Sequence, residues 1–287
     1  MARTNECMES GMGRVKQKTL TQGVLIFAFN NEATDYIAMA AWSARNIRRH
    51  LNLPVAIVTD DPATAAEHKF EHVIVTAPDT GGTRHFADYN ATVTWHNAGR
   101  VNAYNLTPYD QTIVLDADYV VACDDLKRVI HASQDFMCHK TAIDITTGAR
   151  LDNLNYFGDY NFPMWWATVM MFRRSNKAQY IFDCMQMVRD NWQHYRDLYG
   201  IKQANYRNDF ALSIALGIVS GHTLTVDSIP WPLHSVLPST QLSNVHEDSY
   251  MVEYNDIGNK PRQMTFSALD FHAMGKKHLE DIIANPR

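Results

Sequence analysis

Thr112-Ile113-Val114-Leu115-Asp116-Ala117-Asp118-Tyr119-Val120-Val121 is the most informative stretch for the fold of this 287-residue chain. Its first four residues are predicted to form a strand that is buried on both faces. Asp116 and Asp118 follow where that strand ends, and apolar residues resume directly after them. Burying two carboxylates costs several kcal/mol unless they are paired or bind a cation, so the motif predicts a divalent metal site.

Strand and helix signals alternate in the sequence before this motif. Continuous apolar runs predict strands, and amphipathic patterns predict helices between them. The predicted strands are Val24–Phe29, Val55–Val58 and Val73–Val75, and the predicted helices are Ala33–His50 and Val93–Leu106. This alternation is typical of βαβ units with right-handed crossovers. We therefore predict an α/β fold with a mixed, mainly parallel sheet that is flanked by helices.

The second half of the sequence is less regular. We expect a loop at Gly148–Pro163, a strand at Met164–Phe172 and helices at Ser175–Tyr199, Asp209–Val219 (N-capped by Asn208) and Lys277–Ala284. No linker is visible, so we predict a single domain over residues 23–287. The polar residues 1–22 are predicted to be a flexible tail.

Composition and charge argue against several classes of protein. The net charge of −5, with a pI near 6.2, is not that of a surface built as a whole to bind nucleic acid. The four cysteines form no CxxC pair, which is typical of reduced thiols in a cytosolic protein. The longest apolar runs, Val24–Phe29 and Trp165–Phe172, are far shorter than the roughly 20 residues of a membrane span. We expect a cytoplasmic protein without membrane insertion.

The functional site is expected beyond the carboxyl ends of the parallel strands, where the strand order reverses. Polar side chains stand at the ends of three of the predicted strands. These residues are Asn30, Asn31, Thr59, Asp60, Asp116 and Asp118.

Two motifs resemble a known family. Leu106-Thr107-Pro108-Tyr109-Asp110 followed by Leu115-Asp116-Ala117-Asp118 is similar to the GT-A glycosyltransferases of family 8, the glycogenin and lipopolysaccharide galactosyltransferase group. The resemblance covers about residues 23–278. We accordingly expect a donor-binding half at about 23–122 and an acceptor-side half at about 123–287. The resemblance implies the Rossmann-like GT-A fold and a hexosyltransferase-like activity, in which a sugar moves from a UDP-sugar to a hydroxyl acceptor with retention of configuration.

The resemblance also implies a metal site. Asp116 and Asp118 correspond to two of the family's metal ligands, and Asp118 is also a candidate catalytic residue. The segment His272-Ala273-Met274-Gly275-Lys276-Lys277-His278 is similar to the family's H-x-x-G-x-x-K, whose histidine is the third ligand. Two carboxylates with one imidazole suit Mn²⁺, with Mg²⁺ as the alternative.

Basic residues near these ligands are candidates for the diphosphate of the donor. Arg100 lies about 16 positions before Asp116, where the family has a basic donor contact. The family's diphosphate-binding lysine position holds His278 here, so Lys276 or Lys277 is expected to make that contact. Gly275 matches the glycine of the family motif.

The resemblance places the nucleobase pocket after the first strand, where Tyr36 can stack on the base. The candidate donor contacts there and in the metal motif are Ala28, Asn30, Asn31, Tyr36, Asp60 and Ala117.

Asn208-Asp209 resembles the family's Asp-Gln segment, which lies on the sugar side of the site. Asp209 is the candidate catalytic residue that holds the donor sugar or stabilises positive charge at its anomeric carbon. Trp166-Ala167-Thr168 departs from the family's usual Asn-Ala-Gly and leaves the identity of the donor sugar open.

Two segments, Thr107–Asp110 and Tyr206–Asp209, also resemble glycosyltransferases of tailed phages. Some of those enzymes glycosylate hydroxymethylated bases, so this resemblance implies a 5-hydroxymethylated pyrimidine in phage DNA as the favoured acceptor and the host cytoplasm as the location. An extruded base needs an aromatic pocket, and the DNA backbone needs cations. The candidates are Trp165, Trp166, Tyr156 and Phe157 for the pocket and Arg45, Arg48, Arg49, Arg173 and Arg174 for the phosphates.

A cell-surface or storage glycan is the alternative acceptor, and the acidic net charge favours it. Asp152 and Asp159 on the central loop are candidate acceptor contacts.

Three other classes remain to be weighed. An inactive nucleotide-sugar-binding protein would have no need for the intact metal set. A dinucleotide-dependent oxidoreductase would carry GxGxxG after its first strand, where Phe27–Glu32 stands instead. A nucleotidyltransferase would need an early glycine-rich, basic triphosphate loop, and none is present in the sequence.

Overall fold

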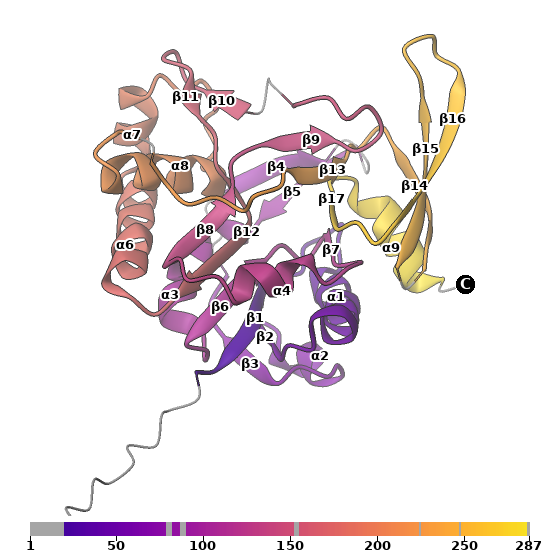
Figure 1. The fold of residues 1–287 in the computed structure, drawn as a ribbon, viewed down its shortest axis with the longest axis horizontal. Coiled ribbons are helices and arrows are strands. Elements are labelled where there is room, and N and C mark those ends of the chain that lie inside the picture. The colour runs from indigo at the N-terminus through magenta and orange to yellow at the C-terminus, as the bar shows by residue number, and fades with distance from the viewer. Residues whose placement is uncertain are drawn as a thin grey trace, which may run out of the picture.

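A six-stranded sheet with the order β3-β2-β1-β6-β12-β8 forms the centre of the molecule (Figure 1). The computed structural model describes residues 20–78, 82–86, 90–151, 155–223, 225–246 and 248–285. In spatial order the strands are β3 (His72–Val75), β2 (Val55–Thr59), β1 (Gln22–Phe27), β6 (Gln111–Leu115), β12 (Trp166–Arg173) and β8 (Phe136–His139).

All but one of these six strands point the same way. β1 pairs in parallel with β2 and β6, and β2 pairs in parallel with β3. β12 is antiparallel to both of its neighbours, β6 and β8. The predicted α/β fold with a mixed, mainly parallel sheet is therefore confirmed.

Helices cover both faces of this sheet, because its strands are apolar on both sides. Val24 and Ile26 of β1 pack into one buried cluster, while Leu25 and Phe27 pack into the other. Helices α1 (Tyr36–Leu51) and α4 (Asp125–Ile130) contribute to the first cluster. The second cluster contains residues of the 3₁₀ helix η2 (Asn97–Asn102) and of the helices α3 (Ala103–Leu106), α6 (Asn176–Asp190) and α8 (Asn208–Val219).

The segment predicted as one helix, Val93–Leu106, begins as a strand, so that prediction is wrong over its first residues. β5 (Ala91–Trp95) pairs with β4 (Gly82–Phe86) in an antiparallel hairpin, and η2 and α3 follow it. The β-branched and aromatic residues of Thr92–Trp95 favour a strand, and pairing with β4 decides the outcome.

Two further segments differ from the prediction. Ser175–Tyr199 is two helices, α6 and α7 (Trp192–Leu198), which are separated at Asn191. The side-chain amide of Asn191 donates to the carbonyl oxygen of Met187 at 2.9 Å, which is a typical use of asparagine at a helix end. Asn208 is the first residue of α8 and Arg207 is its N-cap.

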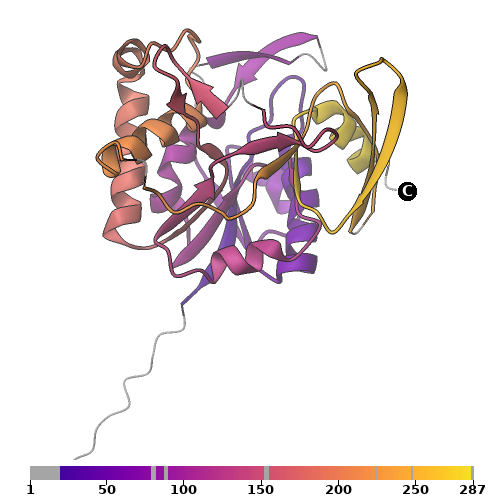
Figure 2. The ribbon, with the colours of Figure 1, turned by 45° about the horizontal axis from the view of Figure 1, so that its top comes forward.

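Smaller sheets lie around the carboxyl edge of the central sheet and near the C-terminus (Figure 2). One has the order β7 (Tyr119–Val120), β17 (Phe271–Ala273), β13 (Leu233–Val236) and β9 (Ala142–Asp144). Another is formed by β14 (Gln241–Val245), β15 (Ser249–Asn255) and β16 (Pro261–Ser267), and α9 (Lys276–Ala284) packs against β14. The hairpin of β10 (Tyr156–Phe157) and β11 (Phe162–Pro163) lies within the predicted loop Gly148–Pro163, and the short helix α2 (Pro62–Ala66) joins β2 to β3.

Most of the predicted N-terminal tail lies outside the described residues. Within the described part, β1 begins at Gln22, and both the backbone N–H and the hydroxyl of Thr21 donate to Asp110. Across the described residues, none of the helices combines the length and the apolar character needed to cross a bilayer.

Candidate active site

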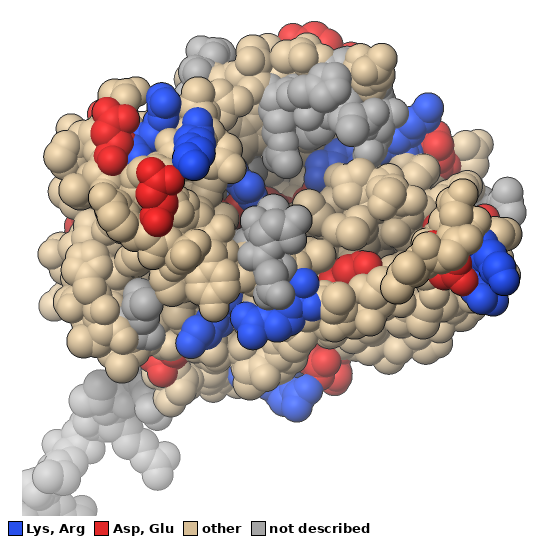
Figure 3. Space-filling model, turned by 90° about the horizontal axis from the view of Figure 1, so that it is seen from above, with Lys and Arg blue, Asp and Glu red and all other residues tan. Residues whose placement is uncertain are grey.

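A cleft of about 950 Å³ opens at the carboxyl ends of β1 and β6. The chain order reverses there, since β2 and β3 lie on one side of β1 and β6 lies on the other. This is the position at which open parallel sheets place their ligands. Figure 3 views the molecule from this side and shows its surface hollowed near the centre, with acidic and basic atoms close together.

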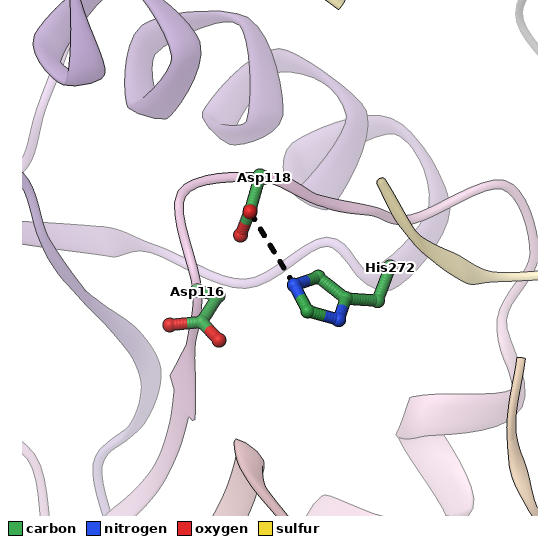
Figure 4. Close-up of side chains that lie close together, drawn as sticks. All are labelled: Asp116, Asp118 and His272. Atoms are coloured by element: carbon green, nitrogen blue, oxygen red, sulfur yellow. Dashed lines mark ion pairs between the residues drawn. The ribbon is translucent and has the colours of Figure 1, made fainter. Parts of the chain in front are cut away.

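Asp116, Asp118 and His272 converge in this cleft, although they come from distant parts of the chain. β6 ends at Leu115, and the short strand β7 that follows the motif pairs with β17, which sets His272 opposite Tyr119. The Nε2 atom of His272 lies 3.3 Å from an Asp118 carboxylate oxygen, and one ligand atom from each of the three residues lies within 4.8 Å of the others (Figure 4). Within the described part of the chain this is the only such group of metal-ligand side chains.

Asp118 is buried and nevertheless ionised. Burial by itself would raise the pKa of its carboxyl group, but the positive charge of Lys276 and the contact with His272 outweigh burial and hold that pKa well below its usual range. The donor set of two carboxylates and one imidazole fits a divalent cation such as Mn²⁺.

Each carboxylate of the motif also has a basic partner within the chain. Arg100 donates to Asp116 and, at 2.9 Å, to the carbonyl oxygen of Ala167. Lys276 donates to Asp118, and both basic side chains are buried. Burial lowers the pKa of Arg100 to about 10, so the guanidinium still carries its charge at neutral pH. The cleft therefore brings buried charges of both signs close together.

Asp209 also lines the cleft and lies in the first turn of α8. One of its carboxylate oxygens accepts from the backbone N–H of Ala167 at 2.9 Å. The other accepts from the Nη2 atom of Arg207 at 2.7 Å. Two donors on different elements hold the carboxylate in one orientation.

Part of the predicted donor pocket also lines the cleft, namely Asn31, Tyr36 and Ala117. The amide of Asn31 is engaged locally, because its oxygen accepts from Ala33 and Thr34 and its nitrogen donates to the carbonyl oxygen of Thr94. Asn31 thus joins the loop after β1 to the β4–β5 hairpin.

Four predicted donor contacts do not line the cleft. Ala28 is buried in the core, and Asn30 uses its side-chain oxygen to accept from the N–H of Ile37 at the start of α1. Asp60 is exposed, and Gly275 is a buried residue directly before α9. Their positions at strand or helix ends were visible in the sequence, but the direction of each side chain depends on its neighbours.

The structure also brings residues to the cleft that the sequence analysis missed, among them Trp95 and His96. Both were missed because the strand of the hairpin that leads to them was predicted as part of a helix. The alternation of residue types in Thr92–Trp95 could have indicated that strand. Arg207 was likewise missed, although it directly precedes the Asn208-Asp209 motif.

The acceptor candidates are divided among several places. Trp166 and Thr168, where the sequence departs from the family pattern, line the cleft, whereas Trp165 is fully buried in the core. Tyr156, Phe157 and Asp159 line a second pocket, and Asp152 lies outside the described residues.

None of the five arginines proposed for phosphate contact lines the cleft. Three of them bind nearby groups of the protein itself. Arg48 pairs with Glu71, Arg173 donates to the carbonyl oxygen of Ala132 and Arg174 donates to that of Thr107.

Comparisons with known proteins give a partial likeness of fold. No protein-family description matches the sequence, and no curated protein matches it. The structure resembles the glycosyltransferase GlyE of Streptococcus pneumoniae TIGR4 with 12% identity and a TM-score of 0.39, over 73% of this chain and 45% of that one. It resembles the galactosyltransferase LgtC, solved with donor and acceptor sugar analogs, with 12% identity and a TM-score of 0.45, over 69% of this chain and 70% of that one. The chain thus spans less than half the length of GlyE.

Proposed function

We propose that this chain is a metal-dependent glycosyltransferase of the GT-A type, which moves a sugar from a nucleoside-diphosphate sugar, with UDP as the nucleotide, to a hydroxyl group with retention. The observation that carries the proposal is the meeting of Asp116, Asp118 and His272 with two buried cations in one cleft at the reversal point of the sheet. A nucleoside diphosphate is the ligand whose charge matches a divalent cation together with basic side chains.

In this proposal Asp116, Asp118 and His272 hold Mn²⁺ or Mg²⁺, which when bound neutralises charge on the departing diphosphate. Arg100 and Lys276, which pair with the Asp116 and Asp118 carboxylates, add positive charge beside the same phosphates. Asn31 and Tyr36 stand on the nucleoside side of the cleft.

Asp209 acts on the sugar in this proposal. Its carboxylate is fixed by Ala167 and Arg207, so its negative charge can stabilise the positive charge that develops at the anomeric carbon. The acceptor oxygen forms the new bond to that carbon as the bond to the diphosphate oxygen breaks, and the hydroxyl proton leaves to the diphosphate. Because the configuration is retained, the acceptor oxygen reaches the anomeric carbon from the face on which the diphosphate departs.

The first experiment measures release of UDP from labelled UDP-glucose, UDP-galactose and UDP-N-acetylglucosamine, with Mn²⁺ or with EDTA. We expect release from at least one donor that depends on the metal, and the same release in Asp60→Ala, whose exposed carboxylate lies outside the cleft. Absence of UDP binding by calorimetry in the presence of Mn²⁺ would refute the proposal.

A further inference from the structure

A second pocket of about 600 Å³ lies beside the cleft, and we call it the side pocket. Its floor is apolar and formed by the buried side chains of Phe157, Met164 and Phe210. The rings of Phe157 and Phe210 pack with their centroids 5.0 Å apart. The Phe210 ring is also packed against Trp192, with the ring centroids 5.9 Å apart, and the Arg207 guanidinium lies over it. The floor is therefore a rigid apolar support for the rim of the pocket.

The walls of the side pocket are held by close contact between two backbone segments. Gly158 in the β10–β11 turn and Gly200 after α7 both have positive φ, of 70° and 62°. A Cβ atom on Gly158 would lie 2.0 Å from the carbonyl oxygen of Tyr199, and one on Gly200 would lie 2.8 Å from the side chain of Asp159. Only glycine permits this approach, so the pocket is part of the folded architecture.

Tyr156 supplies an accessible ring at the rim of this pocket. Its side chain lines the pocket and the residue is 47% exposed, in contrast to the buried aromatic residues of the floor. An exposed tyrosine over an apolar floor offers a stacking face together with a hydroxyl group that can donate or accept.

The charges around the pocket are balanced. Lys202 lies 3.4 Å from a carboxylate oxygen of Asp159, and Arg207 lies 2.7 Å from one of Asp209. Both cations of the lining therefore already have an anionic partner. Such a rim suits a neutral, polyhydroxylated ligand and does not suit the phosphate backbone of a nucleic acid, which binds to clusters of uncompensated cations.

The side pocket and the cleft meet at Arg207, which lines both of them. Arg207 is the N-cap of α8 and pairs with Asp209. In the proposed function, Asp209 stabilises positive charge at the anomeric carbon of the donor sugar. A ligand of two or more rings in the side pocket would therefore extend over Arg207 towards the reacting centre.

We propose that the side pocket binds a sugar ring of a neutral oligosaccharide acceptor, at a distance of one or more rings from the hydroxyl group that receives the transferred sugar. This inference rests on the proposed function, because an acceptor exists only if the chain transfers a sugar. It favours a glycan over hydroxymethylated DNA.

The test compares Tyr156→Ala with the matched control Tyr160→Ala, which removes a more exposed tyrosine, at 76%, from the same hairpin outside the side pocket. Wild type and both variants, loaded with UDP and Mn²⁺, are applied to a printed array of neutral glycans, and UDP affinity is measured by calorimetry. We expect binding of wild type to at least one neutral glycan, with binding weakened about tenfold in Tyr156→Ala by loss of the stacking face. Tyr160→Ala should match wild type, and UDP affinity should be equal in all three.

The inference is overturned if Tyr156→Ala binds the glycan as wild type does, if no neutral glycan binds, or if hydroxymethylated DNA alone accepts label. Failure of the proposed function has a different signature. In that case wild type neither binds UDP nor releases it from a UDP-sugar, whereas a loss of glycan binding confined to Tyr156→Ala still supports the side pocket.

Discussion

The cleft and the side pocket differ in how they treat charge. The cleft buries Arg100, Asp118 and Lys276, and each of these side chains has an oppositely charged partner from a distant part of the chain. The side pocket keeps its Lys202–Asp159 pair at an exposed rim and has an apolar floor built from the β10–β11 region and α8. Buried charge is tolerated only where it is paired, so the cleft is suited to an ionic ligand and the side pocket to a neutral one.

This difference predicts where substitutions act. Changes in the cleft should alter metal binding, nucleotide chemistry and the stability of the metal-free protein. Changes in the side pocket should alter stability or acceptor binding and leave the nucleotide site intact.

Asp118→Asn should have the largest effect. It removes a buried charge from the metal set while keeping the size of the side chain, so metal-dependent release of UDP should fall by about 1,000-fold. Steady-state kinetics with saturating UDP-sugar measure this, and Asp60→Asn is the control for a strand-end carboxylate outside the cleft. Activity equal to that of wild type would remove the metal site from the mechanism.

Lys276→Ala should destabilise the metal-free protein by about 3 kcal/mol, because it leaves the Asp118 carboxylate buried without its ammonium partner. Mn²⁺ should then restore more stability to the variant than it adds to wild type, since the cation replaces the lost charge. Urea unfolding with EDTA and with Mn²⁺ measures both effects. Lys277→Ala, at the exposed next position, should change neither, and equal losses in the two variants would contradict the pairing.

Gly158→Ala tests the architecture of the side pocket against Gly148→Ala. Both glycines have positive φ, of 70° and 66°, so alanine is strained at each. Open space surrounds Gly148, whereas the carbonyl oxygen of Tyr199 blocks a Cβ atom at Gly158. We expect Gly158→Ala to be the less stable by about 2 kcal/mol in urea unfolding. UDP affinity should be equal in the two, and a selective loss of it in Gly158→Ala would mean that the two regions are coupled.

His139 tests the rule that unpaired buried groups lose their charge. Its Nδ1 atom bonds to the carbonyl oxygen of Trp231, and burial lowers the pKa of the ring to about 4. Below pH 6.5 the unfolded chain takes up a proton that the folded protein does not, so stability falls as the pH falls from 6.5 towards 4. Between pH 7 and pH 5, wild type should lose about 2 kcal/mol more than His139→Gln in urea unfolding. Parallel pH profiles for the two proteins would contradict this.

Asp209→Asn should have the smallest effect, a fall of about tenfold in the turnover of UDP-sugar with little change in donor affinity. Asparagine keeps an oxygen for the N–H of Ala167 and loses the charge next to the anomeric carbon. Asp159→Asn, on the rim of the side pocket, should leave this turnover unchanged. Weakened donor binding at unchanged turnover would give Asp209 a binding role.

Five of the six strands of the central sheet and the helices α1, α8 and α9 could be predicted from the sequence, because the spacing of apolar residues reports the conformation of one segment at a time. The sixth strand, β8, was not predicted. The apolar run Thr112–Leu115 followed by two carboxylates was sufficient to place a strand end and a charged site there. The helix predicted at Val93–Leu106 failed because pairing with β4, a long-range contact, decided the conformation of Ala91–Trp95.

The partners of the charged residues were decided only by the tertiary structure. Lys276 and Arg100 were predicted as donor contacts from the sequence, but their pairing with Asp118 and Asp116 became visible only in the fold. The glycine contacts that hold the side pocket likewise join two segments whose separate sequences say nothing of each other. A local pattern determines which way a segment folds, whereas the approach of two segments depends on the packing of everything between them. The sequence by itself determined where the main strands lie and which charged residues follow β6. Packing determined which charges meet.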